Sequence, residues 1–413
     1  MTHYKYKNML RWLVPGARVK RYIFLAGLGT LLVTLSEFVV QDKTLKFMFF
    51  IIGQILVIAG LTAIIARLWR STPKGMSNVT RADQMYKEVK LDSGPQIVAF
   101  GGGTGLSSML RAAKKITSNI TAIVTVADNG GNSGVLRKEL GVLPPGDIRN
   151  CMIALSETEY MMDDLLNYRF QEGTLSGYCM GNLILVAMSD MQGGFLKGIK
   201  SASEVLAVTG QVLPVTLENV HLIAKMNDGE IIEGEDLVGT AQREHGGYIE
   251  EVYLNPKNCK ALPQALEAIE KADIITFGPG SLYTSILPNL LVDGVVEKIK
   301  KSKAVKIYIS NLMTQSGETE HYDVYSHIKA IEDHIGDKIF DYVLVNDNIQ
   351  IPKEVLKRYK LEFAEPVELG NHAISKNKYI VIRENLMENI DNRIRHSMDR
   401  LANVINRVYN KYK

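Results

Sequence analysis

Cysteine is scarce in this sequence, and the usual short catalytic and nucleotide-binding motifs are absent. The three cysteines form no C-x-x-C pair, so neither a disulfide framework nor a thiolate zinc site is indicated. No Gly-Lys-Ser/Thr occurs, which excludes a P-loop, and no G-x-S-x-G elbow or H-E-x-x-H helix is present. The eight histidines do not cluster. These absences favour binding over catalysis.

Strong charge of one sign is also missing. The chain of 413 residues has 48 Lys and Arg against 45 Asp and Glu, a formal charge of +3. It therefore offers no overall basic field that would collect nucleic acid. We expect no nucleic-acid partner. The length suits one large domain or two ordinary ones.

Long apolar runs are confined to the first seventy residues. Residues 22–40 contain one charged residue, Glu37, and residues 47–66 contain none. About 20 residues of helix, rising ~1.5 Å each, cross the ~30 Å hydrocarbon core of a bilayer. A cleaved signal peptide does not fit, because a second apolar run follows at once. The sequence predicts a transmembrane helical hairpin over residues 22–66.

Basic residues flank both ends of this hairpin. The tail, residues 1–21, carries six Lys or Arg and no acid, and three more basic residues follow between positions 67 and 74. Cytoplasmic flanks are enriched in Lys and Arg, so we expect a two-pass protein of the cell membrane with both termini and the main domain in the cytoplasm. Buried core helices of a soluble protein are the disfavoured alternative. Residues 67–95 are polar and broken by Pro and Gly, which indicates a linker.

Short apolar runs alternate with helical stretches after residue 95. Alternation of this kind predicts an α/β domain with a doubly wound, mostly parallel sheet over residues 96–385. Loops at the carboxyl ends of such strands converge on one crevice. Four of the runs end on glycine-rich or polar turns, which are residues 101–105, 127–134, 278–281 and 310–311.

Two segments depart from the alternation. Residues 210–255 contain short extended pieces broken at Asn227-Asp228-Gly229, and they indicate a small β insertion. Residues 386–413 carry apolar residues at helical spacing. We expect this last segment to be a helix that packs on the domain.

The first turn, residues 101–105, lies between a strand and a helix expected over residues 106–115. Glycines there let backbone N–H groups approach a phosphate, with the positive end of the helix dipole behind them. Close packing of strand and helix also selects glycine. The G-x-G-x-x-G fingerprint is incomplete, because Leu106 stands where its last glycine would be. This disfavours an NAD(P)-dependent dehydrogenase, for which no proton donor is evident either.

Polar groups on the later turns leave several roles open. Asp128 could hold a sugar hydroxyl, a Mg²⁺ ion or only its own turn N–H. Residues 144–150 lead into a helical stretch expected to begin near Cys151. Asp147 is a candidate N-cap of that helix. Arg149 is a candidate bidentate donor to a phosphate.

Six motifs, in this order, closely resemble the YvcK (GlmR) family, and the resemblance covers about residues 97–402. Members are also called gluconeogenesis factors or UDP-N-acetylglucosamine-binding proteins, and they are relatives of the CofD-type 2-phospho-L-lactate transferases. The motifs are Gly101-Gly102-Gly103-Thr104-Gly105-Leu106-Ser107, Asp128-Asn129-Gly130-Gly131-Asn132-Ser133-Gly134, Pro145-Gly146-Asp147-Ile148-Arg149-Asn150, Gly181-Asn182, Gly278-Pro279-Gly280-Ser281-Leu282-Tyr283-Thr284-Ser285 and Asn311-Leu312-Met313-Thr314-Gln315.

The resemblance implies a Rossmann-like, CofD-like fold and a cytosolic sensor of a UDP-sugar. Such a sensor balances carbon flow between gluconeogenesis and cell-wall precursor synthesis, and so affects cell shape. Glucosamine-6-phosphate synthase is the implied protein partner, a homodimer is left open, and no cofactor is required.

Two features depart from the family pattern. The second turn commonly reads Asp-Asp-Gly-Gly-Ser-Ser-Gly in this family, whereas Asn129 and Asn132 here replace an acid and a serine. Loss of one carboxylate weakens any divalent-metal site on that turn. The hairpin before residue 71 is additional to the shortest members.

Two hypotheses follow. In the first, a non-catalytic regulator, residues 101–105 and 278–281 hold the diphosphate of UDP-N-acetylglucosamine and residues 128–134 face its sugar or base. In the second, a CofD-like enzyme transfers a phosphoryl-containing group from a nucleotide diphosphate adduct, with Asp128 helping to hold Mg²⁺ and no identified general base. The expected ligand-binding residues are Gly101, Gly102, Gly103, Thr104, Gly105, Asp128, Asn129, Gly130, Ser133, Gly134, Asp147, Arg149, Asn150, Asn182, Gly278, Pro279, Gly280, Ser281, Thr284, Asn311 and Thr314.

Overall fold

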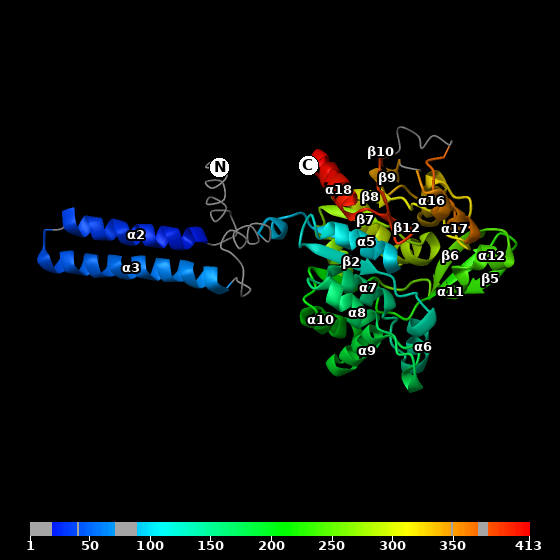
Figure 1. Cartoon of the computed structure of the whole chain (residues 1–413), viewed down its shortest axis with the longest axis horizontal. Helices are drawn as coiled ribbons and strands as arrows, with labels where there is room; N and C mark the ends of the chain where they lie inside the picture. Colours follow the sequence, from blue (N-terminus) through cyan, green and yellow to red (C-terminus); the bar gives the residue numbers. More distant parts are fainter. Residues whose placement is uncertain (1–18, 39–40, 71–88, 348–349, 371–378) are drawn as a thin grey trace. The chain divides into compact units, whose positions relative to one another are not determined.

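The computed structural model describes residues 19–38, 41–70, 89–347, 350–370 and 379–413. The chain divides into two compact units, residues 1–94 and residues 95–413 (Figure 1). The boundary falls within the predicted linker, of which residues 71–88 lie outside the described residues.

Two antiparallel helices, α2 (Val19–Phe38) and α3 (Lys43–Arg70), make up the described part of the first unit. Glycines let the helices approach closely: a Cβ on Gly29 would lie 2.6 Å from the carbonyl oxygen of Gly53. Small residues at such contacts are typical of helix pairs in membranes. Lys46 Nζ lies 2.9 Å from Glu37 Oε2 near the turn between the helices.

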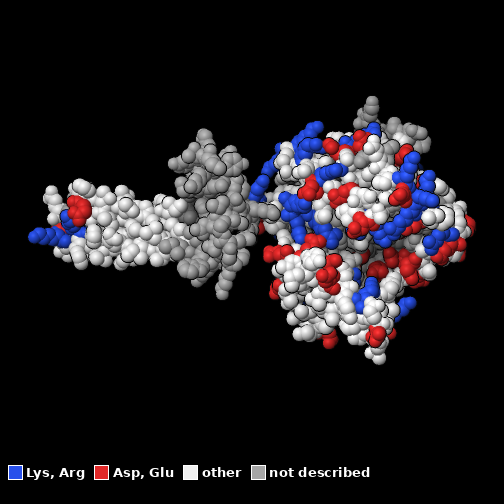
Figure 2. All heavy atoms as spheres, in the orientation of Figure 1, with Lys and Arg blue, Asp and Glu red and all other residues white. Residues whose placement is uncertain are grey.

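The outward surface of this hairpin is apolar. Large hydrophobic side chains are exposed along both helices, and on the face that Figure 2 shows charged atoms are visible at the turn; Arg21 at the other end of α2 is also exposed. Both helices are long and apolar enough to cross a membrane. Within the described residues, both predicted spans are helical and lie in α2 and α3. Most of the basic tail lies outside the described residues.

Seven parallel strands form the central sheet of the second unit, and the predicted doubly wound parallel sheet is confirmed. The strands are short and mostly buried, as expected where helices cover both faces, except for the partly exposed edge strand at Ile380–Glu384. In sheet order the strands are β10 (Ile380–Glu384), β9 (Tyr342–Asn346), β8 (Val305–Ile309), β7 (Ile274–Phe277), β1 (Ile97–Gly101), β2 (Ile120–Val124) and β3 (Gln211–Pro214).

Alternation along each strand divides the core into two layers. On β1, Ile97 and Ala99 join the core under one set of helices, whereas Val98 and Phe100 join the core on the other face. The Phe100 ring stacks on Phe277 of β7 with centroids 5.4 Å apart. The first face is covered by α5 (Gly103–Ala113), α7 (Gly146–Leu155), α10 (Phe195–Val205) and α18 (Met398–Tyr412).

A small antiparallel sheet and further helices cover the second face. This sheet has the order β5-β4-β6, with β4 at His221–Met226, β5 at Ile231–Glu233 and β6 at Ile249–Asn255. The helices on this face are α13 (Pro263–Lys271), α14 (Leu287–Leu290), α15 (Val295–Lys301) and α16 (Val324–Ile335). The remaining elements are α6 (Gly131–Leu140), α8 (Glu159–Asn167), η2 (Gly173–Leu175), α9 (Met180–Gln192), α11 (Glu235–Val238), α12 (Ala241–His245), η3 (Leu282–Ile286), α17 (Lys353–Leu361), β11 (Met387–Ile390) and β12 (Arg393–His396).

Two predicted boundaries are wrong. The β insertion does not begin at residue 210, because residues 211–214 pair with β2 as the edge strand of the main sheet. The segment expected to be one helix from residue 386 first forms the hairpin β11–β12. Leu386, Ile390 and Ile394 recur every fourth residue, as on one face of a helix, but a turn separates the last two, and Ile394 pairs with Asn389 across the hairpin.

Candidate functional site

A pocket of about 620 Å³ opens at the carboxyl ends of the central strands. Strand β1 pairs with β2 on one side and with β7 on the other, so the strand order reverses there. Open α/β sheets bind ligands at this switch point. The predicted residues that line the pocket are Gly102, Gly103, Thr104, Gly105, Asp128, Asp147, Pro279, Gly280, Ser281, Thr284 and Asn311.

The two glycine turns touch each other at the floor of the pocket. Gly103 begins helix α5 with φ +55°, a conformation that L side chains rarely adopt. A Cβ on Gly105 would lie 2.3 Å from the carbonyl oxygen of Pro279. The first turn of α5 can therefore pack against the loop after β7 only because residue 105 is glycine.

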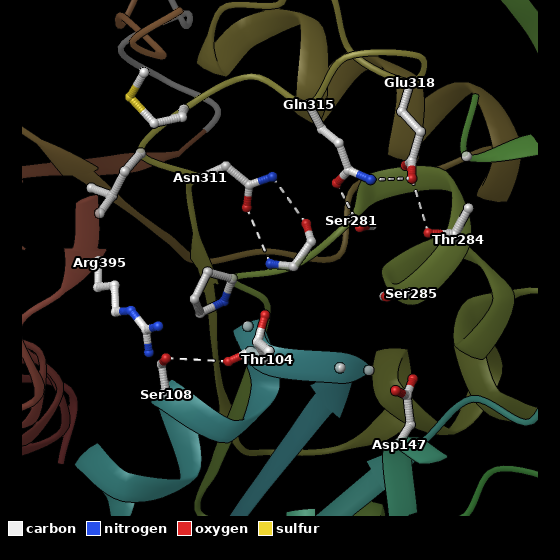
Figure 3. A pocket seen from close by; sticks show the side chains of 18 of the residues that line it. Thr104, Ser108, Asp147, Ser281, Thr284, Ser285, Asn311, Gln315, Glu318 and Arg395 are labelled. Atoms are coloured by element: carbon white, nitrogen blue, oxygen red, sulfur yellow. Dashed lines mark hydrogen bonds between the residues drawn. The ribbon is translucent and has the colours of Figure 1, made fainter. Parts of the chain in front are cut away.

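Side chains that follow β8 fix the loop after β7 (Figure 3). Asn311 Oδ1 accepts a hydrogen bond from the Gly280 N–H at 3.1 Å, and Asn311 Nδ2 donates to the Gly280 carbonyl at 2.9 Å. The Ser281 hydroxyl donates to Gln315 Oε1 at 2.6 Å. Asn311, one of the expected ligand-binding residues, thus directs its amide at the protein backbone in this structure.

A buried carboxylate, Glu318, supports the same loop. It accepts hydrogen bonds from the Thr284 hydroxyl at 3.0 Å, from Gln315 Nε2 at 2.7 Å and from the Tyr283 N–H at 3.1 Å. Burial raises the pKa of Glu318 to about 7. Its charge is therefore sensitive to pH near neutrality.

Three further carboxylates share this side of the pocket. Burial, and then the negative charge of Asp128, raises the pKa of Asp147 to about 7, although the Gly103 N–H bonded to Asp147 opposes the shift. Burial, followed by Asp128 and Asp147, raises the pKa of Glu235 to about 8. Burial also raises the pKa of Asp128. An acidic wall thus faces the glycine turns.

The predicted start of the helix around Asp147 is wrong. Helix α7 begins at Gly146, and its N-cap residue is Pro145. Asp147 therefore lies inside the first turn, where its carboxylate reaches the Gly103 N–H at the start of α5. The position suits it, since an acid is stabilised near a helix N-terminus.

The C-terminal hairpin supplies a basic and apolar wall that sequence reasoning missed. Arg393, Ile394 and Arg395 of β12 line the pocket together with Tyr359 of α17. Figure 3 shows Arg395 directed toward Ser108 and Thr104 at the start of α5. The Tyr359 hydroxyl accepts the Ile394 N–H at 3.0 Å. The sequence signal for this hairpin was the dipeptide Asp391-Asn392. Asp and Asn tolerate the positive φ that a two-residue type I′ hairpin turn requires, and both residues have positive φ here.

Comparison with known proteins matches this architecture. The sequence model of the family described as 2-phospho-L-lactate transferase CofD matches residues 97–387. A Bacillus subtilis protein named gluconeogenesis factor is 45% identical over 312 residues, which are 75% of this chain and 97% of that protein. The chain belongs to the CofD family and to its gluconeogenesis factors.

Two other relatives match different shares of this chain. A crystal structure of a UPF0052-family protein from Bacillus halodurans matches with a TM-score of 0.71 and 46% identity, covering 75% of this chain and 98% of that chain. A Clostridium acetobutylicum relative is 41% identical over 412 residues, covering 96% of this chain and 91% of that protein. The Bacillus halodurans protein thus folds with a counterpart of about three quarters of this chain.

Several motif residues of this chain build the interior behind the pocket. Arg149 is buried and donates to Asn182 Oδ1 at 2.7 Å, to Asn150 Oδ1 at 2.9 Å and to Cys179 Sγ at 2.9 Å. None of these four residues lines the pocket. The alternative in which Arg149 pairs directly with a phosphate has no support in this arrangement.

The second turn is also held mainly by protein groups. Asp128 Oδ1 accepts the Gly130 N–H at 2.9 Å, and the Ser133 hydroxyl also bonds to Asp128. Asn129 Oδ1 accepts the Asp236 N–H at 3.0 Å. A Cβ on Gly134 would lie 1.9 Å from the Asn129 carbonyl oxygen. Only Asp128 of this turn lines the pocket.

The other predicted residues outside the pocket lining are structural. The Gly101 carbonyl accepts Asn289 Nδ2 at 3.0 Å, and Gly278 is buried with φ +73°. The Thr314 hydroxyl accepts the Glu365 N–H at 2.9 Å. Within the described residues, no three His, Cys, Asp or Glu side chains are placed to hold a metal ion.

Proposed function

We propose that the second unit, residues 95–413, is a soluble unit that binds UDP-N-acetylglucosamine. In this proposal it acts as a non-catalytic regulator of carbon flow between gluconeogenesis and cell-wall precursor synthesis. The observation that carries the proposal is the meeting of two glycine turns at the β1–β7 switch point. There the start of α5 opens into a pocket of about 620 Å³. Pockets of ~300–1,000 Å³ suit small molecules of this size class.

The opposed walls of the pocket suit the two halves of such a ligand. The start of α5 and Arg395 supply backbone N–H groups and positive charge for a diphosphate. Asp128, Glu235 and Glu318 are acceptors for the hydroxyl and amide groups of the sugar. Tyr359 and Ile394 add an apolar surface beside them.

The cellular role rests on the relatives and on the hairpin. The name gluconeogenesis factor, carried by the Bacillus subtilis relative, supports a part in carbon metabolism. The two apolar helices support a two-pass membrane anchor that leaves the soluble unit in the cytoplasm. Control of glucosamine-6-phosphate synthase, an effect on cell shape and a homodimeric state are parts of the same proposal.

Isothermal titration calorimetry on residues 95–413 tests the ligand directly. We expect saturable heat with UDP-N-acetylglucosamine, weaker heat with UDP, and none with NADP or with a guanosine diphosphate adduct. Saturable heat with NADP or the guanosine adduct, and none with the UDP-sugar, would reject the proposal.

Substitution of Arg395 tests the position of the diphosphate. Hydrogen bonds to charged groups contribute ~1.5–3 kcal/mol, so Arg395→Ala is expected to weaken binding by about tenfold or more. Arg383→Ala is the matched control, because Arg383 is exposed and pairs with Asp347 away from the pocket. Equal affinities for both variants would place the ligand elsewhere.

A CofD-like, Mg²⁺-dependent transferase is the second candidate. The match to the CofD model favours it, as do Asp128 and Asp147 beside the first glycine turn. Mg²⁺ is usually held by one or two carboxylates together with substrate phosphates, which these two residues fit. Its test is Mg²⁺-dependent product formation from a guanosine diphosphate adduct, with loss of that product in Asp128→Asn.

A further inference from the structure

A second cavity, of about 540 Å³, lies beside the first pocket and has no part in the proposed function. Its walls carry three aromatic rings, from Tyr248, Tyr322 and Phe363. Tyr248 and Phe363 are 55% and 69% exposed, so a ligand entering the cavity can reach both rings from solvent. The volume falls within the range of small-molecule sites.

Charged groups sit among these rings. Glu320 and Glu365 line the cavity, with Lys360 and His321 at the same walls. His321 Nδ1 lies 2.9 Å from Glu365 Oε1. Glu320 Oε1 accepts the Gly317 N–H at 2.9 Å, which fixes that carboxylate in place. Two carboxylates, from Glu320 and Glu365, therefore stand among the aromatic rings, with the ammonium group of Lys360 at the same cavity.

The backbone around the cavity is held in unusual conformations. His321 has φ +64° and Phe363 has φ +55°. Non-glycine residues in this region are uncommon and gather at ligand clamps and switch regions. Two such residues, from segments far apart in the sequence, line one cavity here.

A single loop joins this cavity to the first pocket. Gln315 and Glu318 line the first pocket, whereas Glu320 and Tyr322 line the second. The Tyr322 hydroxyl lies 2.9 Å from the Tyr283 hydroxyl, and the Tyr283 N–H donates to Glu318. Tyr322 is therefore connected through Tyr283 to Glu318, which supports the loop after β7.

A second connection runs through Glu365. The Thr314 N–H donates to the Glu365 carbonyl at 2.7 Å, and the Glu365 N–H donates to the Thr314 hydroxyl at 2.9 Å. Thr314 follows Asn311 on the same loop, and Asn311 holds Gly280 in the first pocket. Both walls of the second cavity are thus bonded to segments that shape the first.

We propose that this second cavity binds a small organic cation, an ammonium or guanidinium group on an aromatic or apolar body, and that its occupancy changes the affinity of the first pocket. Aromatic faces and carboxylates both attract a cation. The coupling depends on the proposed function, since it is read out as nucleotide-sugar affinity. Binding of the cation itself does not.

Phenethylamine is the probe, and 2-phenylethanol is its uncharged counterpart. In saturation-transfer NMR on residues 95–413 without nucleotide, we expect the amine to bind about tenfold more tightly than the alcohol. Phe363→Ala and Glu320→Gln should abolish this preference, whereas Leu361→Ala and Glu354→Gln, exposed positions outside the cavity, should keep it. Equal binding of amine and alcohol, or no saturable binding of either, overturns the cation site.

The coupling is measured by calorimetry with UDP-N-acetylglucosamine in the presence and absence of saturating amine. We expect its Kd to shift by about fivefold or more, with a reciprocal shift for the amine, and no shift in Phe363→Ala. An unchanged Kd overturns the coupling. Absence of all UDP-sugar binding rejects the proposed function but leaves the NMR result on the cation site standing. Binding of the peptide acetyl-Phe-Arg-amide but not of the free amine would overturn a small-molecule occupant in favour of a protein partner.

Discussion

The side chain of Asn311 holds both polar groups of the Gly280 residue. Its Oδ1 accepts the Gly280 N–H at 3.1 Å, and its Nδ2 donates to the Gly280 carbonyl at 2.9 Å. A side chain after β8 therefore sets the shape of the turn after β7. Pre-organisation of this kind lowers the cost of binding, because the turn needs no ordering when the ligand arrives.

Asn311→Ala should weaken UDP-N-acetylglucosamine binding. Two hydrogen bonds contribute ~0.5–1.5 kcal/mol each, so we expect a loss of about tenfold, within a range of a few-fold to a hundredfold. Calorimetry on residues 95–413 measures it. Asn167→Ala, at an exposed position of α8, should bind normally. Full affinity in Asn311→Ala would show that the turn is held by other contacts.

Gly103→Val should abolish nucleotide-sugar binding while the domain stays folded. Gly103 has φ +55°, so the substitution strains the backbone by ~1–3 kcal/mol, and the new side chain enters the space of the diphosphate. Gly141→Val is the matched control, because Gly141 also has positive φ but lies in open space. Circular dichroism should be native for both variants. A native Gly103→Val that binds normally would move the site away from this turn.

Stability of the soluble unit should fall as pH rises through neutrality. The pKa values of Asp147 and Glu318 are raised to about 7 and that of Glu235 to about 8. The folded state therefore binds protons more tightly than the unfolded state, whose carboxyl groups have their ordinary values. This contribution is complete below the unfolded pKa and is lost as pH rises through 7 and 8.

Thermal melting from about pH 7 to about pH 8.5 measures this dependence, because buried histidines with lowered pKa values, such as His327 and His334, titrate below that interval and with the opposite sign. The melting temperature should decline by several degrees, and Asp147→Asn should reduce the decline because it removes one of the three groups. Asp190→Asn, at an exposed position, should not. A wild-type melting temperature that rises over this interval would contradict the assigned pKa directions.

The full-length protein should sediment with membranes and resist washing with salt or carbonate, whereas residues 71–413 should be soluble. Cysteine tags at Thr2 and Ser77, which lie outside the described residues, should be labelled only after permeabilisation, because basic flanks stay in the cytoplasm. Release by carbonate would show that the helices are not inserted. Labelling of either tag on intact cells would reverse the topology.

Local pattern was sufficient to predict the fold class and the floor of the pocket. The strand before Gly101 and the glycines after it are adjacent in sequence, so their geometry is a local property. The apolar helices of the hairpin are equally local, since composition and length alone define them. The sequence did not indicate that Arg149 and Asn150 lie outside the pocket lining, because burial of a side chain is not a local property.

The amino-acid sequence by itself determined the parallel sheet, its glycine turns and the apolar hairpin, because periodicity and turn chemistry act between neighbours in the chain. Only the tertiary structure decided the walls of the pocket. Glu235, Glu318 and Arg395 come from three separate segments, and their approach depends on how the small sheet and the C-terminal hairpin pack on the central strands. Asp147 shows the same division: its place in α7 is local, but its raised pKa depends on burial and on Asp128.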